Sequence, residues 1–282
     1  MKKLVLLLML VFSVVAFGAC NSKPKVEGLI EEGKLYVGLS ADYAPYEFID
    51  LTKEGDEKYV GSDITFMKKI AEELGLQLVL KPMAFDNILT ALDTDKIDIA
   101  ISGFTYAPYR AENYLFSSAY FDDGEGDQIL VFNKANQEKF KSLEDLNKAD
   151  VKVGAQNGSL QQSLVTEQLP NANHIFFEDV NNAFTALKDG QYDAIAVASV
   201  VAEALLSSEE NKDIVASSFM FEVEDSALYA IMKKGNEKLA EAINPVCEEV
   251  AKGDYQKWLD AANQLYEDLG ENAGSEIIEP EE

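Results

Sequence analysis

A single arginine, Arg110, stands among 24 basic residues, and every other one is a lysine. A guanidinium presents a planar fork that binds a carboxylate through two parallel hydrogen bonds, whereas a lysine ammonium acts as a point charge. Arg110 follows an apolar segment at 97–101 and the turn Ser102-Gly-Phe-Thr105. This setting predicts a carboxylate-binding residue; the alternative is a surface arginine without a special role.

The elements that must position Arg110 follow a βαβαβ pattern that occurs twice. Apolar segments predict strands at 35–39, 77–80, 97–101, 128–132, 151–155, 174–177, 193–197 and 226–232. Apolar residues at helical spacing predict helices at 62–74, 85–92, 160–168, 179–187, 237–252 and 254–266. We therefore expect an α/β fold with two mostly parallel sheets, each covered by helices.

Two extended crossings join the units, and the C-terminal helices return to the first one. We assign residues 29–127 and 224–262 to lobe 1 and residues 128–223 to lobe 2. In open α/β sheets, ligands bind beyond the carboxyl ends of the strands, near loops and helix N-termini. Segments 102–105 and 156–159 fall at such ends, which predicts a ligand site in a cleft between the lobes.

Both ends of the chain carry signals outside the folded part. Two lysines, an apolar stretch at 4–17 and small residues predict a signal peptide over residues 1–19. The stretch Phe17-Gly-Ala-Cys20 resembles the lipobox of bacterial lipoproteins, whose cysteine is diacylated, so we expect a lipidated Cys20 and a tether over 20–28. Cys247 lies in a helical pattern and is expected to be a buried hydrophobe without a disulfide partner. Residues 263–282 are expected to form an acidic tail.

The net charge of −26 and the pI near 4.3 exclude a basic surface that could neutralise nucleic-acid phosphates or adhere to anionic lipid. We find no Cys/His metal spacing, phosphate-binding glycine loop or Ser-His-Asp pattern, so no cofactor, metal or catalytic residue is expected. The single histidine, His174, lies on a predicted edge strand and is interpreted as structural.

Several motifs occur in an order shared with one family. They include Ser40-Ala-Asp-Tyr-Ala-Pro-Tyr-Glu-Phe48, Gly61-Ser-Asp-Ile64, Phe85-Asp-Asn-Ile88, Lys96-Ile-Asp98 through Arg110, Val153-Gly-Ala-Gln-Asn-Gly-Ser159 and Asp193-Ala-Ile195. Over residues 30–260, the chain resembles the amino-acid-binding lipoproteins of ABC importers, the family 3 extracellular solute-binding proteins. The resemblance implies a type II periplasmic-binding-protein fold, whose two lobes close by a hinge motion around one ligand.

The resemblance also implies a role for each matched residue. Arg110 matches the arginine that binds the α-carboxylate of the ligand, and Gly103 and Thr105 match groups that bind its amino and carboxylate groups. Tyr43 and Phe85 match rings on either side of the ligand side chain, with ordinary core aromatics as the alternative. The second lobe supplies a helix N-terminus and a position facing the ligand side chain: Ser159, Leu160 and Gln161, and Gln156.

Two positions depart from the family pattern. The family usually carries an acid for the ligand's ammonium group where this chain has Ala198, followed by Ser199, and no acid lies between Asp193 and Glu203. Either another acid serves, with Asp42 as the candidate, or the ligand is not a simple α-amino acid. Ala107 replaces a common threonine near the carboxylate.

The resemblance implies a non-enzymatic, monomeric receptor on the outer face of the cell membrane. Its partners would be an amino acid, the permease and ATPase of an ABC importer, and the membrane through the lipid anchor. Two alternatives stay open: a carboxylate-binding sensor lipoprotein, and an enzyme like the cyclohexadienyl dehydratases, which share the fold and would need a general acid in the cleft.

Overall fold

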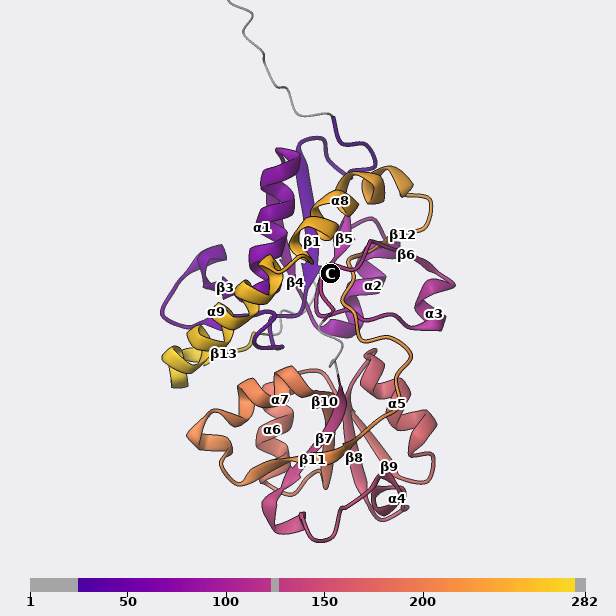
Figure 1. The fold of residues 1–282 in the computed structure, drawn as a ribbon, viewed down its shortest axis with the longest axis vertical. Coiled ribbons are helices and arrows are strands. Elements are labelled where there is room, and N and C mark those ends of the chain that lie inside the picture. Colours follow the sequence, from indigo (N-terminus) through magenta and orange to yellow (C-terminus); the bar gives the residue numbers. More distant parts are fainter. Residues whose placement is uncertain (1–24, 123–126, 277–282) are drawn as a thin grey trace, which may run out of the picture.

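The computed structural model describes residues 25–122 and 127–276, which form two lobes, each around a five-stranded sheet (Figure 1). The lobe 1 sheet has the order β4-β1-β5-β12-β6, with β1 (Lys34–Leu39), β4 (Gln77–Pro82), β5 (Ile99–Ala100), β6 (Tyr114–Phe116) and β12 (Ile231–Lys233). The lobe 2 sheet has the order β11-β7-β10-β8-β9, with β7 (Gln128–Asn133), β8 (Lys152–Gln156), β9 (Asn173–Phe177), β10 (Ala194–Ala198) and β11 (Ile214–Met220).

Helices cover both faces of each sheet. Lobe 1 contains α1 (Ser62–Leu74), α2 (Phe85–Asp93), α3 (Pro108–Ala111), α8 (Glu237–Val250) and α9 (Asp254–Leu269). Lobe 2 contains α4 (Leu143–Leu146), α5 (Leu160–Gln168), α6 (Val180–Lys188) and α7 (Ser199–Leu206). The short 3₁₀ helices are η1 (Gly55–Lys58), η2 (Lys134–Asn136), η3 (Glu209–Asn211) and η4 (Gly270–Asn272). Helices α1 and α5 have the predicted bounds, and Gly75 ends α1 in the left-handed conformation, as expected of a C-terminal cap.

Both sheets are mixed, which differs from the mostly parallel arrangement expected. In lobe 1, β1 pairs in parallel with β4 and β5, whereas β12 is antiparallel to β5 and β6. In lobe 2, β8 is parallel to β9 and β10, whereas β7 is antiparallel to β10 and β11. The antiparallel strands β7 and β12 follow the two crossings, because a chain that arrives from the other lobe enters the sheet from its opposite end.

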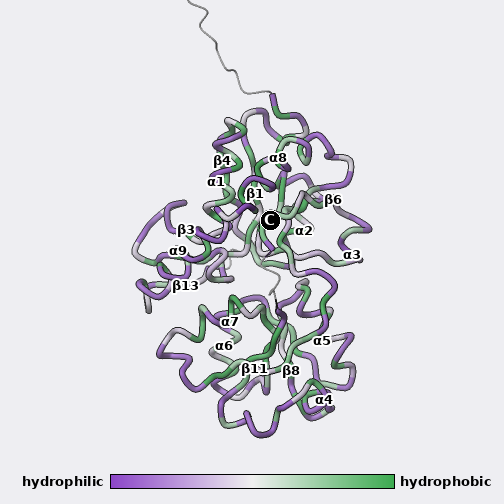
Figure 2. Tube along the Cα trace, viewed as in Figure 1, coloured by the Kyte–Doolittle hydropathy of each residue, from purple (hydrophilic) through white to green (hydrophobic). Residues whose placement is uncertain are grey.

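Each sheet lies between two apolar layers, and apolar stretches follow its strands (Figure 2). In lobe 1, Leu35, Val37 and Leu39 of β1 are fully buried in the layer that also contains the apolar face of α1. The opposite layer is built on α2, with Ile88 and Leu92. This double coverage explains why the inner strands are nearly continuous apolar runs.

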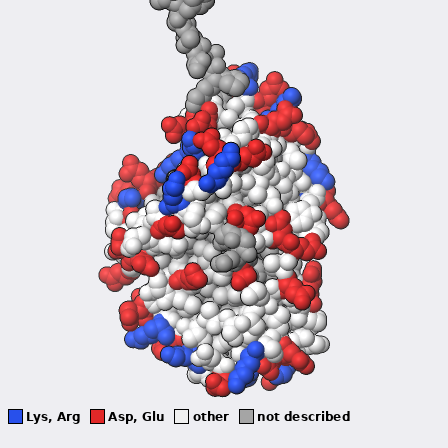
Figure 3. Space-filling view, in the orientation of Figure 1, with Lys and Arg blue, Asp and Glu red and all other residues white. Residues whose placement is uncertain are grey.

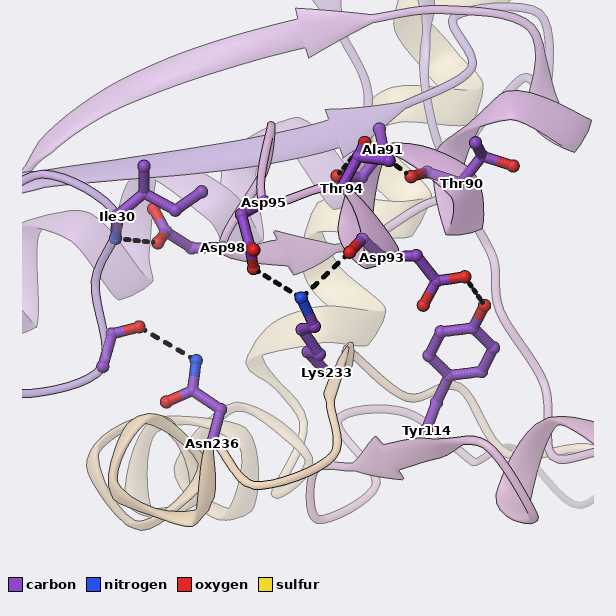
Figure 4. Close-up of polar contacts among 11 residues, drawn as sticks. Ile30, Thr90, Ala91, Asp93, Thr94, Asp95, Asp98, Tyr114, Lys233 and Asn236 are labelled. Atoms are coloured by element: carbon purple, nitrogen blue, oxygen red, sulfur yellow. Dashed lines mark hydrogen bonds and ion pairs between the residues drawn. The ribbon is translucent and has the colours of Figure 1, made fainter.

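The N-terminal part of lobe 1 is held to the sheet by polar contacts (Figure 4). The Asp98 carboxylate accepts hydrogen bonds from the amides of Ile30 at 2.7 Å and Tyr36 at 2.8 Å. Nearby, the Lys233 ammonium on β12 lies 2.8 Å from Asp95 Oδ1 and 2.9 Å from the Asp93 carbonyl oxygen, which ties β12 to the end of α2.

The expected acidic tail over 263–282 is wrong for its described part. Helix α9 continues to Leu269, and β13 (Ala273–Gly274) pairs with β2 (Phe48–Asp50), which also pairs with β3 (Tyr59–Val60). The helix persists because Leu265, Tyr266 and Leu269 pack in a small apolar cluster with Phe48 and with Ala204 of α7. The high acid content of this segment masked that apolar spacing. The signal peptide and Cys20 lie outside the described residues.

The structure also differs from the expected elements in lobe 2 and in the return crossing. Helix α7 and strand β11 were not predicted, whereas the strand expected at 226–232 is confined to β12. Before β12, Leu228 instead forms isolated bridges with Thr105 and Phe121 as the chain passes the cleft.

In the described part of the chain, no helix is long and apolar enough to cross a membrane.

Candidate ligand-binding site

A pocket lies between the two lobes, and most of the predicted site residues line it. Its lobe 1 wall and the return crossing supply Tyr43, Tyr46, Phe85, Ser102, Gly103, Thr105, Arg110, Ser226 and Leu228. Its lobe 2 wall supplies Gln128, Gln156, Ser159, Leu160, Gln161, Ala198, Ser199 and Val200. The structure therefore brings together nine of the ten predicted ligand-binding residues; the exception is Asp42, which is not part of the wall.

Arg110 projects from the short helix α3 and is only 1% exposed. Its guanidinium donates to two carbonyl oxygens, Thr105 O at 3.3 Å and Gly158 O at 2.9 Å, the second of which belongs to lobe 2. Its Nε has no hydrogen-bond partner among the described residues, and no carboxylate within them forms an ion pair with it.

Aromatic rings surround this guanidinium. Its central carbon lies 5.0 Å from the centre of the Phe104 ring and 5.9 Å from that of Phe85. Burial lowers the pKa of Arg110, but a guanidinium stays protonated in proteins. The pocket thus contains a buried cation with an unused N–H, which is suited to an anionic group of a ligand.

The N-terminus of α5 forms the opposing wall. The Ser159 hydroxyl accepts from the Gln162 amide at 3.1 Å and donates to the Gln156 carbonyl at 2.6 Å, so Ser159 caps the helix. The first helical residues, Leu160 and Gln161, line the pocket. Amides in the first turn of a helix lack intrahelical acceptors and favour negative charge, so this wall suits the anion that Arg110 would bind.

Tyr43 connects the aromatic wall of lobe 1 to lobe 2. Its hydroxyl accepts from Gln161 Nε2 at 3.0 Å and from the Ala198 amide at 3.4 Å. Burial is the main reason why the pKa of Tyr43 is raised, so the hydroxyl is neutral. The Tyr43 ring stacks on Tyr46 with 5.9 Å between centroids, while Phe85 packs against Phe104 at 4.8 Å.

Two buried acids, Asp63 and Glu47, accept hydrogen bonds from the turn 102–105 and hold it in place. The Gly103 amide donates to Asp63 Oδ2 at 2.9 Å, and the Ser102 hydroxyl donates to Glu47 Oε1 at 2.6 Å. Gly103 has a φ of +57°, and a Cβ there would lie 3.2 Å from the Tyr43 ring, so a side chain would disturb both the backbone and the pocket wall.

The two acids belong to a larger buried network. Asp63 Oδ1 also accepts from the hydroxyls of Tyr120 at 3.0 Å and Tyr255 at 2.5 Å. Burial, and then the charge of Asp63, raises the pKa of Glu47 well above its usual value; burial also raises the pKa of Asp63. Asp63 accepts hydrogen bonds from three donors and Glu47 from one, so the surrounding donors favour the negative charge on Asp63, whereas burial favours the protonated form of Glu47.

The sequence did not reveal six wall residues: Tyr46, Gln128, Ser199, Val200, Ser226 and Leu228. Ser102 lies in the segment 102–105 that was expected at the cleft, and Ser199 directly follows Ala198, so its position was within reach. Ser226 and Leu228 lie on the return crossing, which was interpreted as a strand. His174 lies on β9, its Nε2 is 2.8 Å from the Leu169 carbonyl, and it is not part of the wall.

Comparison with known families decides the class of protein. Residues 35–261 match the bacterial extracellular solute-binding proteins, family 3. The chain belongs to this family. The match covers both sheets apart from Lys34, the first residue of β1, and every wall residue of the pocket, and it ends within α9.

Relatives in this family differ in their ligands. The L-cystine-binding protein TcyJ of Escherichia coli strain K12 is 31% identical over 80% of this chain and 82% of its own length. The cyclohexadienyl dehydratase of Pseudomonas aeruginosa is 27% identical over 68% of both. The crystal structure of the substrate-binding protein AbpA of Streptococcus pneumoniae, bound to L-arginine, is 34% identical with a TM-score of 0.75 and covers 83% of this chain and 96% of AbpA. The two-lobed type II periplasmic-binding-protein fold is thereby confirmed.

Proposed function

We propose that this protein is the extracytoplasmic binding component of an ABC importer for an amino acid, which it captures between its lobes without catalysis. The observation that supports the proposal most directly is the buried Arg110, whose Nε lacks a partner within the described structure and whose pocket includes the N-terminus of α5. Both features suit the α-carboxylate of an amino acid. The relatives TcyJ and AbpA, which are named as binding proteins, support the same role.

The chemistry of the wall favours a polar ligand with an uncharged side chain. Arg110 is the one charged side chain among the described wall residues; the others include three glutamines and several hydroxyl groups. An arginine or lysine side chain would leave water without meeting a carboxylate in this wall, which is costly. The ammonium group of the ligand, which meets Ala198 in place of the family's acid, would be held by neutral oxygen atoms.

After capture, the closed protein would deliver the amino acid to a permease driven by an ATPase. Acidic side chains are spread over both lobes on the face shown in Figure 3, which agrees with the net charge of −26. A surface of this sign repels phosphate backbones and anionic lipid. The protein would therefore act as a monomer that depends on its anchor, and not on its charge, to stay at the membrane.

A ligand screen tests the proposal. We expect uncharged polar amino acids, with L-glutamine as the first probe, to raise the unfolding temperature more than L-arginine does. A ligand present at 100 times its Kd stabilises the folded state by about 2.7 kcal/mol, which a thermal-shift assay detects. Carboxylates without an amino group, and turnover of a cyclohexadienyl carboxylic acid, serve as controls. Stabilisation by such carboxylates alone, or turnover, would contradict an amino-acid receptor.

Membrane anchoring through Cys20 completes the proposal. Two or more acyl chains hold a protein stably on a membrane, because each buried methylene contributes about 0.8 kcal/mol. We expect the protein to incorporate radiolabelled fatty acid and to fractionate with membranes, and we expect Cys20→Ser to abolish the label. Cys247→Ser is the matched control and should retain it, since Cys247 is buried. Label that persists in Cys20→Ser would contradict the assignment.

A further inference from the structure

Asp42 lies between the lobes but outside the pocket wall. It belongs to the segment after β1 in lobe 1, and it is only 1% exposed. Its Oδ1 accepts from the hydroxyl of Ser40 at 2.7 Å within the same lobe. Its Oδ2 accepts from two lobe 2 donors, Gln156 Nε2 at 2.8 Å and the Val180 amide at 3.0 Å. A third lobe 2 group, Asn181 Nδ2, lies 3.3 Å from the Asp42 carbonyl oxygen.

The Val180 contact places the carboxyl group of Asp42 at the N-terminus of α6. The side chain of Asp179, which caps this helix, accepts from the Asn182 amide at 2.6 Å. The Val180 amide therefore finds its acceptor in the other lobe. Because helix N-terminal amides carry a partial positive charge, this is a favourable place for a carboxyl oxygen of the opposing lobe.

The Gln156 contact fixes the orientation of a pocket side chain. Gln156 Nε2 donates both to Asp42 and to the Glu178 carbonyl, at 2.8 and 2.9 Å, so both of its hydrogens are used. A flipped amide would point its oxygen at two acceptors, which excludes that orientation. The Oε1 atom is then the side-chain atom of Gln156 that a bound molecule can use, and it is an acceptor.

We propose that Asp42 is a positioning residue for ligand binding: it joins lobe 1 to β8 and α6 of lobe 2 when the cleft closes, and it directs Gln156 Oε1 toward the ligand as an acceptor. This inference rests on the proposed function, because it assigns a donor group, such as an ammonium or a carboxamide, to the ligand. It also replaces the earlier expectation that Asp42 itself contacts the ammonium group.

Three variants test the proposal. Asp42→Ala removes every side-chain contact, and we expect it to weaken L-glutamine binding, or binding of the best amino acid in the screen, by about 10- to 100-fold, as for loss of a hydrogen bond to a charged group. Asp42→Asn can accept from Gln156 and Val180 and donate to Ser40, and should bind within about threefold of wild type. Asp86→Ala, the control, removes another inter-lobe bond, from Asn157 at 2.7 Å, which touches no wall side chain, and should have a smaller effect than Asp42→Ala.

Small-angle X-ray scattering measures the closure of the two lobes independently of ligand affinity. With saturating amino acid, wild type and Asp42→Asn should reach the same small radius of gyration, while Asp42→Ala should stay larger. Scattering without any amino acid compares how far wild type, Asp42→Asn and Asp42→Ala close on their own. This comparison tests the inference about Asp42 even if the protein turns out not to bind amino acids. Wild-type affinity and wild-type compaction in Asp42→Ala would overturn it.

The pH profile is a second test that does not need Asp42→Ala to fold. Burial, and then the charge of Asp179, raises the pKa of Asp42 to about 7, and Glu47 and Tyr43 of lobe 1 also interact with it electrostatically. When the cleft opens to water, the pKa should return toward about 3.9. Closure thus takes up a proton, and amino-acid affinity should rise as the pH falls from about 8 to 5 in wild type. A flat profile is expected in Asp42→Asn; equal slopes in both proteins would overturn the assignment.

Discussion

Arg110→Ala is expected to weaken amino-acid binding by about 2–5 kcal/mol, which corresponds to about 30- to 5,000-fold in Kd. The carboxylate of the ligand would lose its charged partner but would still be drawn out of water when the lobes close. Calorimetric titration with the amino acids that stabilise wild type measures the effect. Arg110→Lys should recover part of the affinity, because it restores a positive charge without the two parallel hydrogen bonds.

The stability of the ligand-free protein distinguishes a binding role of Arg110 from a structural one. Its guanidinium is buried against Phe104 and Phe85, donates to two carbonyl oxygens and lacks a described acid partner. A desolvated charge of this kind costs free energy in the folded state. Arg110→Ala should therefore unfold at nearly the wild-type temperature without ligand. Wild-type affinity in Arg110→Ala, or a large drop in the unfolding temperature of ligand-free Arg110→Ala, would contradict the assignment.

The sequence predicted those features of the fold and the site that depend on residues close together in the chain. Apolar residues at helical spacing predicted α1 and α5 with their observed bounds. The isolation of Arg110 pointed to the centre of the pocket. In each case the relevant neighbours are close in sequence, or one face of an element must be buried, so local spacing suffices.

The rest depends on contacts between distant segments. Asp42 was the candidate acid for the ligand's ammonium group in place of Ala198, yet its carboxyl group accepts from the Val180 amide of α6, which is 138 residues away. The packing of Tyr266 and Leu269 against α7 likewise gives structure to a segment whose charge predicted a tail. Neither the contact of Asp42 with α6 nor the packing of α9 against α7 can be derived from one element, since each depends on how the two lobes pack together.

Asp63→Ala is expected to lower the free energy of unfolding by about 3–5 kcal/mol, a large loss for one side chain. The change would leave the Gly103 amide and the Tyr120 hydroxyl without an acceptor, and each buried unsatisfied group costs about 1–3 kcal/mol. The Tyr255 hydroxyl would keep only its contact with Ser62 Oγ, at 3.1 Å. Removal of a buried charge offsets part of the sum. Urea unfolding at pH 7 measures the change, with Asp254→Ala, which loses only an exposed pair with Lys257, as the control.

Glu47→Gln tests whether the network depends on a proton held by Glu47. Because burial raises the pKa of Glu47, folding takes up a proton above the usual glutamic acid pKa, and this contribution to stability falls as the pH rises through the raised value. Glutamine is permanently neutral, can accept from Ser102 and can donate to Asp63. We expect Glu47→Gln to stay within about 1 kcal/mol of wild type at pH 7 and to lose less stability toward pH 9, because it has no proton to release. A loss as large as that of Asp63→Ala would mean that Glu47 is ionised in the folded protein and that the negative charge of the network lies on it.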